Sequence, residues 1–409
     1  MKKLAFVSAL LLCVVSAKAQ TMYFWKSNVA LAADAAALGV MEYSQNGTAL
    51  TVVDSVMNLQ DIDSITVGTP VGASTVKVVY GANGAWAVIP FALSRKVAVS
   101  IDGGYVDAVS TAVDGNDIEY SLSGESNDGA FTQTGTYKCS VSLEGLSLVS
   151  KRGAAINIAN GKRIKFLLAD GTVNTLSDLA GGTQKACLYV KGHPEFEGGG
   201  TLNVTGNTSH AIGTGEYMYV KSGNINILSA ANDGIHAGQY FKIKGGSVVV
   251  RNAKGDGIQA DVTKDATDEF NGQMFINGGR IDITSTAADA KLLRSDSLMT
   301  VSGGTIVING NGEGIKGMAT DGNLVVNQDN GTVSIDITVS GGVYTDPATG
   351  ETSKTRCIKV DGDFTITAGT IRANATGKKS ATIKVDGVSA KGGAASVTTN
   401  DGYEFDKTI

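Results

Sequence analysis

The sequence predicts an all-β protein folded as a right-handed parallel β-helix, a solenoid whose coils stack on one another, with a small N-terminal region or cap. A Gly-Gly or Ser-Gly pair followed by alternating apolar residues recurs along the chain, and several copies are evenly spaced. No part of this region shows sustained 3.6-residue periodicity, so helices are not expected. A unit of two or three short strands cannot bury its apolar face alone, so neighbouring units must stack.

The first residues have the pattern of a secretory signal peptide. Lys2 and Lys3 precede an apolar run over 4–15, and Ala17-Lys18-Ala19 forms a small-x-small cleavage pattern. Leu12 before Cys13 is too bulky for a typical lipoprotein cleavage site. We therefore expect residues 1–19 to be removed near Ala19 and the mature protein to be released rather than lipid-anchored.

Composition excludes several classes of protein. The 409 residues include 53 Gly but only 4 Pro, which rules out collagen and Pro-rich disorder. The formal net charge is −5, which argues against nucleic acid as a partner because phosphate binding needs clustered Lys and Arg. After residue 19 no apolar run approaches the roughly 20 residues of a membrane-spanning helix.

Residues 20–95 differ from the rest and are predicted to form the N-terminal region or cap. Both tryptophans, Trp25 and Trp86, lie here. Strands are expected at 61–67 and 76–80, and the Ala-rich stretch 31–40 reads as a short helix or a linker. A solenoid needs such a cap because its last coil would otherwise expose strand edges and core.

The β-helix is expected over residues 96–391, with the C-terminal tail 392–409 covering its other end. The second glycines of three successive units are Gly200, Gly223 and Gly246, two steps of 23 residues. An antiparallel β-sandwich would show turns every ~8–12 residues without such self-similarity. The repeats are Gly199–Val204, Ser222–Ile227, Gly245–Val250, Gly278–Ile283, Gly303–Ile308 and the late copy Ala368–Ile371.

Counting about ten residues from the second glycine of each unit predicts a ladder of carboxylates at one corner: Asp233, Asp256, Asp289 and Glu313. Stacked coils would hold these like charges about 5 Å apart. Calcium would relieve their repulsion, since it takes several hard oxygen ligands. The alternative is a solvated acidic turn whose side chains splay apart.

The small and apolar residues that follow the corner, as in Ala211-Ile212, place basic residues there upstream, namely Arg152, Lys185 and His210. The corner is therefore expected to have a basic half followed by an acidic half. The step of 33 residues from Gly246 to Gly279 contains about ten extra residues, 261–271, which we expect to leave the solenoid as a solvated loop. That loop could also add metal ligands or hang over a groove.

Cysteine and histidine are too few to define a site from sequence. The mature cysteines, Cys139, Cys187 and Cys357, include no C-x-x-C pair and are expected to be small buried hydrophobes. The histidines are dispersed at positions 193, 210 and 236, and without geometry they do not indicate a zinc site.

The sequence resembles a family of secreted, calcium-binding, carbohydrate-binding domains of parallel β-helix form, similar in architecture to pectate lyases. The resemblance covers about residues 97–390 and rests on the run 167–178 (LLADGTVNTLSD), on 120–124 and 141–146, and on the Asp-Gly-Ile corners. It implies binding of acidic plant polysaccharide such as polygalacturonate, with cellulose as a further ligand class, and it implies Asp233, Asp256 and Asp289 as metal ligands. Arg152, Lys185 and His210 depart from the family's acids. The segment around 23–26 and 62–65 resembles secreted proteins of Gram-negative bacteria.

The leading functional hypothesis is a non-catalytic, calcium-assisted polysaccharide-binding protein, secreted or held at the cell surface or in the periplasm. Lys221 and Lys242 could supplement calcium, and Tyr240 could belong to a small aromatic platform with Tyr217, Tyr219 and Phe241. A polysaccharide lyase is the second hypothesis, because Lys291 and Arg294 follow the acidic ladder and a lyase needs a basic residue beside its calcium. The third is an adhesin or surface scaffold without a sugar ligand.

Overall fold

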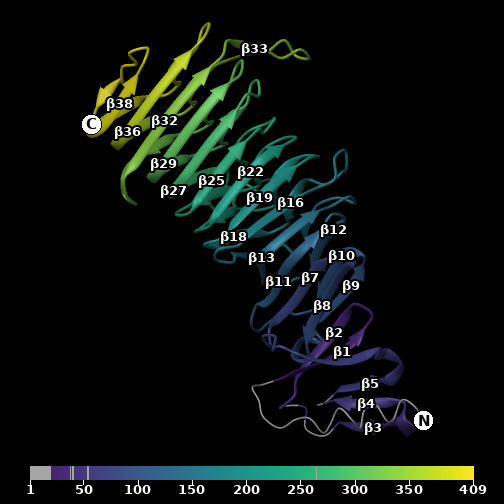
Figure 1. The fold of residues 1–409 in the computed structure, drawn as a ribbon. Coiled ribbons are helices and arrows are strands. Elements are labelled where there is room, and N and C mark those ends of the chain that lie inside the picture. The colour runs from purple at the N-terminus through teal and green to yellow at the C-terminus, as the bar shows by residue number, and fades with distance from the viewer. Residues whose placement is uncertain (1–19, 37, 39–40, 53–54, 264) are drawn as a thin grey trace.

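The computed structural model describes residues 20–409 except 37, 39–40, 53–54 and 264, so the predicted signal peptide (1–19) lies outside it. The described chain is all-β and contains no α-helix; its helical segments are three short 3₁₀ turns, η1 (Gln45–Gly47), η2 (Leu59–Asp61) and η3 (Phe91–Leu93). No helix in this part of the protein has the length and apolarity that a membrane span requires. Figure 1 shows an elongated array of strands with β1 to β5 toward one end and the C-terminus at the other.

Antiparallel strands form the N-terminal end. β2 (Val29–Asp34) pairs with β1 (Thr21–Lys26), which also pairs with β6 (Ser64–Gly68). The Ala-rich stretch thus begins as a strand and not as the helix considered from composition, because Ala30 and Ala32 are buried with Val88. A separate three-stranded sheet follows, made of β3 (Glu42–Ser44), β4 (Ala49–Val52) and β5 (Ser55–Asn58).

Two hairpins join this end to the stacked coils. The hairpin of β7 (Thr75–Gly81) and β8 (Gly84–Pro90) places β7 in parallel against β11 (Ile118–Ser126). The hairpin of β9 (Val97–Asp102) and β10 (Gly104–Ser110) places β10 in parallel against β12 (Gly129–Thr134). The edge of the first coil is therefore covered, as a stacked array of strands requires.

From β12 onward each coil gives one strand to a 12-stranded sheet and two strands, or one long strand, to a 22-stranded sheet. Pairing between coils is parallel throughout this region except in the small β33–β34 hairpin. The 12-stranded sheet continues through β14 (Ile156–Ile158), β17 (Ala186–Val190), β20 (His210–Thr214), β23 (Ile235–Ala237), β26 (Ile258–Ala260), β28 (Lys291–Ser295), β30 (Lys316–Thr320), β35 (Arg356–Val360) and β37 (Ala381–Val385).

The 22-stranded sheet has two arms. Long strands such as β27 cross from one arm to the other, pairing with β24 in its first half and β25 in its second. The remaining strands are β13 (Cys139–Val149), β15 (Arg163–Leu168), β16 (Val173–Ser177), β18 (His193–Gly198), β19 (Thr201–Gly206), β21 (Met218–Val220), β22 (Asn224–Ala230), β24 (Tyr240–Ile243), β25 (Ser247–Arg251), β27 (Gln273–Ser285), β29 (Met299–Asn311), β31 (Leu324–Val326), β32 (Val333–Ser340), β36 (Phe364–Thr376), β38 (Ser389–Thr399) and β39 (Lys407–Thr408), with a hairpin of β33 (Val343–Thr345) and β34 (Thr352–Lys354).

One continuous hydrophobic core runs through the stack from Val76 to Ala395. Alternating strand residues point into it, and equivalent positions of successive coils are in register. Phe166 and Phe196, for example, pair across β15 and β18, and their rings stack 5.0 Å apart. The three mature cysteines are buried and unpaired, as predicted from their number and spacing.

The recurring glycines mark corners where two coils approach closely. Gly246 has φ +72°, and a Cβ at this position would lie 2.2 Å from the carbonyl oxygen of Gly223 in the preceding coil. Only glycine meets both demands, which explains why this residue recurs at the start of each repeat.

Candidate functional site

The predicted carboxylate corner corresponds to the turn by which each coil enters the 12-stranded sheet. Ile212, Ile235, Ile258 and Leu293 are in register on successive strands. The residues two positions before them therefore form one column, which continues in register through Lys316 and Arg356. We call this the corner column: His210, Asp233, Asp256, Lys291, Lys316 and Arg356.

The predicted four-acid ladder is therefore wrong beyond Asp256. Lys291 and not Asp289 occupies the next position, and Lys316 and not Glu313 the one after it. Counting from the glycines failed because the turn before β28 is two residues longer, and Asp289 adopts the left-handed conformation in it, with φ +56°.

The predicted order of charge along this edge is also wrong. Ala186 is in register with His210, so Lys185 lies outside the column. Arg152 also lies outside it; the side chain stacks on Tyr105 at 4.0 Å and forms an ion pair of 2.5 Å with Asp102. The cations of the column lie downstream of its acids, which is the reverse of the expectation.

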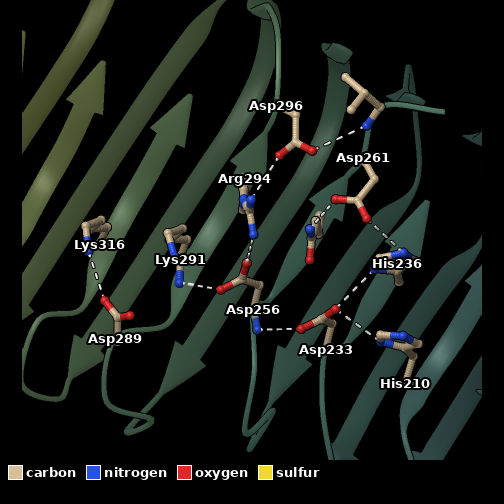
Figure 2. A network of polar contacts seen from close by, with 12 residues as sticks. His210, Asp233, His236, Asp256, Asp261, Asp289, Lys291, Arg294, Asp296 and Lys316 are labelled. Carbon is tan, nitrogen blue, oxygen red and sulfur yellow. Dashed lines mark hydrogen bonds and ion pairs between the residues drawn. The ribbon is translucent and has the colours of Figure 1, made fainter. Parts of the chain in front are cut away.

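Asp233 is the most enclosed acid of the corner column, with an exposure of 5%. Its Oδ2 lies 3.1 Å from Nδ1 of His210 and 3.2 Å from Nδ1 of His236, and its Oδ1 accepts a 2.8 Å hydrogen bond from the amide of Asp256 (Figure 2). Burial favours the protonated carboxyl, but the two imidazoles and the amide outweigh it and lower the pKa of Asp233.

The carboxylate of Asp256 accepts a backbone hydrogen bond and lies near a cation. Its Oδ1 accepts a 2.7 Å hydrogen bond from the amide of Lys291, and its Oδ2 lies 3.6 Å from Arg294 (Figure 2). Burial raises the pKa of this carboxyl. Arg294 also pairs with Asp296 at 3.2 Å, so the two acids hold it in place.

The other two predicted ligands lie apart from this pair. Asp289 forms an ion pair of 3.2 Å with Lys316, and Glu313 is exposed. Calcium needs six to eight convergent oxygen atoms, whereas these four residues are divided between two places and three of them already have protein partners. As a set they do not fit a calcium ion.

A second acidic column exists that the sequence analysis missed. Each member directly follows the last residue of a strand in the 12-stranded sheet, and the amide of each donates to the preceding coil. A recurring Val-Asp-Gly at 360–362 and 385–387 was the available signal. We call these residues the strand-end aspartates: Asp261, Asp296, Asp321, Asp361 and Asp386.

The strand-end aspartates are neutralised unevenly. Lys359 pairs with both Asp361 and Asp386. The carboxylate of Asp321 has no hydrogen bond or ion pair with any residue in the described part of the chain, and burial and two neighbouring carboxylates raise its pKa. This column therefore offers oxygen atoms that protein cations do not fully satisfy.

The predicted sugar-binding residues lie on two faces. Lys221 and Lys242 lie on the arm formed by β18, β21 and β24, with their Nζ atoms 5.5 and 5.2 Å from the ring centre of Tyr219. Lys221 also pairs with Glu195 at 2.6 Å, whereas Lys242 has no carboxylate partner among the described residues. Lys291 and Arg294 belong to the 12-stranded sheet instead. We call Tyr219, Lys221 and Lys242 the basic face.

The aromatic residues beside the basic face form a stack and not an open platform. The rings of Tyr217 and Tyr240 stack with their centres 4.5 Å apart. The ring of His193 also stacks on Tyr217, at 4.3 Å, and the ring of Phe270 contacts Tyr240 edge-on. Phe241 is core. Burial raises the pKa of Tyr240 to about 12. With their faces covered by one another, these rings offer edges and hydroxyl groups to a ligand.

The insertion over 261–271 packs against this stack. Besides the Phe270 contact, the side chain of Gln239 donates a 2.7 Å hydrogen bond to the carbonyl of Glu269. Residues 265–270 are exposed, as expected of a solvated loop, and these two contacts anchor the loop beside the stack.

The fold and these faces define an elongated all-β protein that presents polar surfaces along stacked parallel strands. The chain belongs to the carbohydrate-binding domain-containing protein family, whose model matches residues 107–403. The matched segment begins in β10 and ends in the C-terminal tail, so it covers both faces described above.

A relative and a solved structure are similar to this chain. A carbohydrate-binding domain-containing protein of Acetivibrio thermocellus is 30% identical over 105 residues, 23% of this chain and 37% of the relative, so the chain spans little more than a third of that protein. The structure of a polysaccharide lyase-like protein from C. thermocellum, a gadolinium derivative, has a TM-score of 0.52 and 22% identity, covering 64% of this chain and 99% of its own. The likeness concerns the fold.

Proposed function

We propose that this protein is a right-handed parallel β-helix that binds an acidic polysaccharide such as polygalacturonate without cleaving it. The observation that carries the proposal is the basic face. Lys242 is a half-exposed cation without a carboxylate partner among the described residues, and it lies over the same ring as Lys221. A uronate carboxylate on the polymer would supply the missing anion for Lys242, and the family match makes a carbohydrate the ligand class.

Binding through such a face is weak at each contact and sensitive to salt. An exposed ion pair contributes at most about 1 kcal/mol, and salt screens it. A repeating polymer along stacked coils adds several such contacts within one molecule, so affinity should grow with chain length. Oligogalacturonates of increasing length, titrated calorimetrically at low and high salt, test this, with a neutral glucan as control. Equal binding of the neutral glucan would contradict the proposal.

Calcium-assisted binding stays a prediction, and the strand-end aspartates are now the candidate calcium ligands. Asp321 lies near Asp296 and Asp361, whose charges raise its pKa, and a divalent cation between such carboxylates would relieve that repulsion. Titration with polygalacturonate in calcium and in chelator distinguishes calcium-assisted binding from binding by the basic face alone. Equal affinities would leave the basic face as the whole of the binding mechanism.

The lyase alternative is tested separately. A lyase base must give up its proton, but the neighbouring Asp296 and Asp256 outweigh the effect of burial and raise the pKa of Arg294, which keeps it charged. Release of an unsaturated product that absorbs in the ultraviolet would establish cleavage and overturn the non-catalytic proposal. No binding across a panel of glycans would favour the adhesin alternative.

We also propose secretion in a Gram-negative bacterium after cleavage near Ala19. The proposal rests on the Lys2-Lys3 start, the apolar run and the small residues before Gln20. N-terminal sequencing of protein recovered outside the cytoplasm checks it: a chain that still begins at Met1 would contradict it.

A further inference from the structure

Two histidines and one aspartate from neighbouring coils converge at the buried end of the corner column. His210 begins β20, Asp233 lies in the turn before β23, and His236 lies within β23. One ligand atom from each lies within 4.8 Å of the others, and the two imidazole rings stack at 4.4 Å with a 21° tilt. We propose that His210, Asp233 and His236 form a binding site for a divalent transition-metal ion of the zinc type.

The spacing of the donor atoms suits such an ion. Both Nδ1 atoms face Oδ2 of Asp233, at 3.1 and 3.2 Å. Bonds of about 2.0–2.1 Å and tetrahedral angles would separate two ligand atoms by roughly 3.4 Å, so each nitrogen–oxygen pair needs to shift by only a few tenths of an ångström, and all three ligand atoms already lie within 4.8 Å of one another. Three protein ligands leave a further coordination position open, and the histidine side chains are 15% and 25% exposed, which gives an ion access.

Nδ1 of His210, which faces Asp233, lacks a hydrogen bond, whereas Nδ1 of His236 is hydrogen-bonded to the same carboxylate at 3.2 Å. The His210 nitrogen is buried and lies 3.1 Å from the carboxylate but is not aligned with it. In a tetrahedral site each nitrogen lone pair points at the metal, about 35° away from the line to the neighbouring ligand atom. A nitrogen that is close to a carboxylate oxygen but not aligned with it is the arrangement expected of two ligands that share an ion.

The surrounding residues orient these three ligands. Nε2 of His236 lies 3.2 Å from Oδ2 of Asp261, and Asp261 in turn accepts a hydrogen bond from Gln259 (Figure 2). A metal ion would replace the hydrogen bond between Nδ1 of His236 and Asp233, and the imidazole proton would then sit on Nε2 beside Asp261, as in carboxylate–histidine–metal triads. The amide of Asp256 engages Oδ1 of Asp233 and leaves Oδ2 for the ion.

The donor set selects the class of metal. Two imidazole nitrogens and one carboxylate oxygen suit zinc, cobalt, nickel or copper, whereas calcium prefers oxygen ligands alone. The class of metal therefore differs from that of the calcium prediction, and the site does not depend on polysaccharide binding.

The test uses the mature chain, freed of any affinity tag and stripped with chelator. We expect calorimetry to show one zinc ion bound per chain, undiminished by millimolar calcium, and cobalt to give the intense visible absorption of a four-coordinate site. H210Q and H236Q should each weaken zinc binding by at least about 10-fold, and D261N, which removes only the orienting carboxylate, by roughly 10-fold or more.

His193 provides the matched control because it lies in the Tyr217 stack and not in the cluster. H193Q should bind zinc as the parent does. Circular dichroism in chelator checks that each variant is folded, and D233N replaces any histidine variant that is not. Absence of stoichiometric zinc binding by the parent chain, or unchanged binding in H210Q and H236Q, overturns the proposal, as does an equal loss in H193Q.

Discussion

At the scale of single residues, what a charged side chain can do here depends on whether the fold has already given it a partner. Arg294 is clamped between Asp256 and Asp296, and Lys316 is held by Asp289, so neither is free to meet a ligand. Lys242 differs because its contact in the described chain is an aromatic ring. A basic side chain therefore has a structural role in the 12-stranded sheet, whereas on the basic face we propose a binding role for it.

This difference predicts the effect of Lys242→Gln. The substitution keeps most of the contact with Tyr219 but removes the positive charge, so we expect affinity for an oligogalacturonate to fall about two- to five-fold at low salt and the salt dependence to weaken. Calorimetric titration measures both. Lys96→Gln, an exposed lysine in the N-terminal half, makes the same charge change away from the basic face and should leave the affinity unchanged.

The buried thiols predict both a reactivity and a pH effect. Burial raises the pKa of Cys139 and Cys357 to about 12. The native protein should therefore react with a thiol reagent at pH 8 only after urea unfolds it. Because an unfolded thiol ionises near ~8.5, the unfolded state binds fewer protons between these values, and each thiol lowers stability by up to about 1.4 kcal/mol per pH unit as pH rises.

The urea midpoint measured between pH 8 and 10 checks whether stability falls as pH rises. Lysines also titrate in this range, so the comparison is with Cys139→Ala, which should show a shallower fall with pH whatever its stability at pH 8. Identical slopes for the two proteins would show that the thiol does not contribute.

At the scale of elements, alternation and glycine spacing predict the strands better than they predict register. Alternating residues such as Leu202 and Val204 are buried strand residues, as expected, because period two follows directly from strand geometry. The alignment of coils beyond Asp256 was wrong because turn length varies: the two additional residues before β28 moved Asp289 out of the column without leaving a hydrophobic signal. The His210–His236 cluster was missed for a related reason, since only exact register brings it together.

The corner glycines give the prediction at this scale. Gly246→Ala should destabilise the protein by more than the roughly 1–2 kcal/mol that a left-handed conformation costs, because its Cβ would also meet the Gly223 carbonyl at 2.2 Å. Gly145 has φ +78° and open space, so Gly145→Ala should show the conformational cost alone. Gly393 has neither constraint, and Gly393→Ala should be nearly neutral. Urea midpoints rank the three, and equal effects would contradict the close-approach argument.

At the scale of the whole molecule, a stack of parallel strands must be closed at both ends. The N-terminal hairpins cover the first coil, and the tail covers the last one less completely: β39 pairs with two residues of β38, and Phe405 packs against Phe364 at 5.5 Å. The side chains of Tyr403 and Phe405 are only partly buried. At the C-terminal end, core residues and a strand edge thus lie close to solvent.

Removing this cover should cause the protein to associate end to end. Phe405→Ser takes away the aromatic contact with Phe364 and loosens the tail, so the edge of β38 becomes available to pair with another chain. We expect a lower thermal midpoint and a molar mass that rises with protein concentration in light scattering after size exclusion. Ile409→Ser is the matched control, because Ile409 is 57% exposed and contributes little to the core. A Phe405→Ser protein with unchanged mass and midpoint would mean that the other contacts of the tail close the stack, namely the pairing of β38 with β39 and the hydrogen bonds of Asp401 with Thr382 and of Asp406 with Ser389.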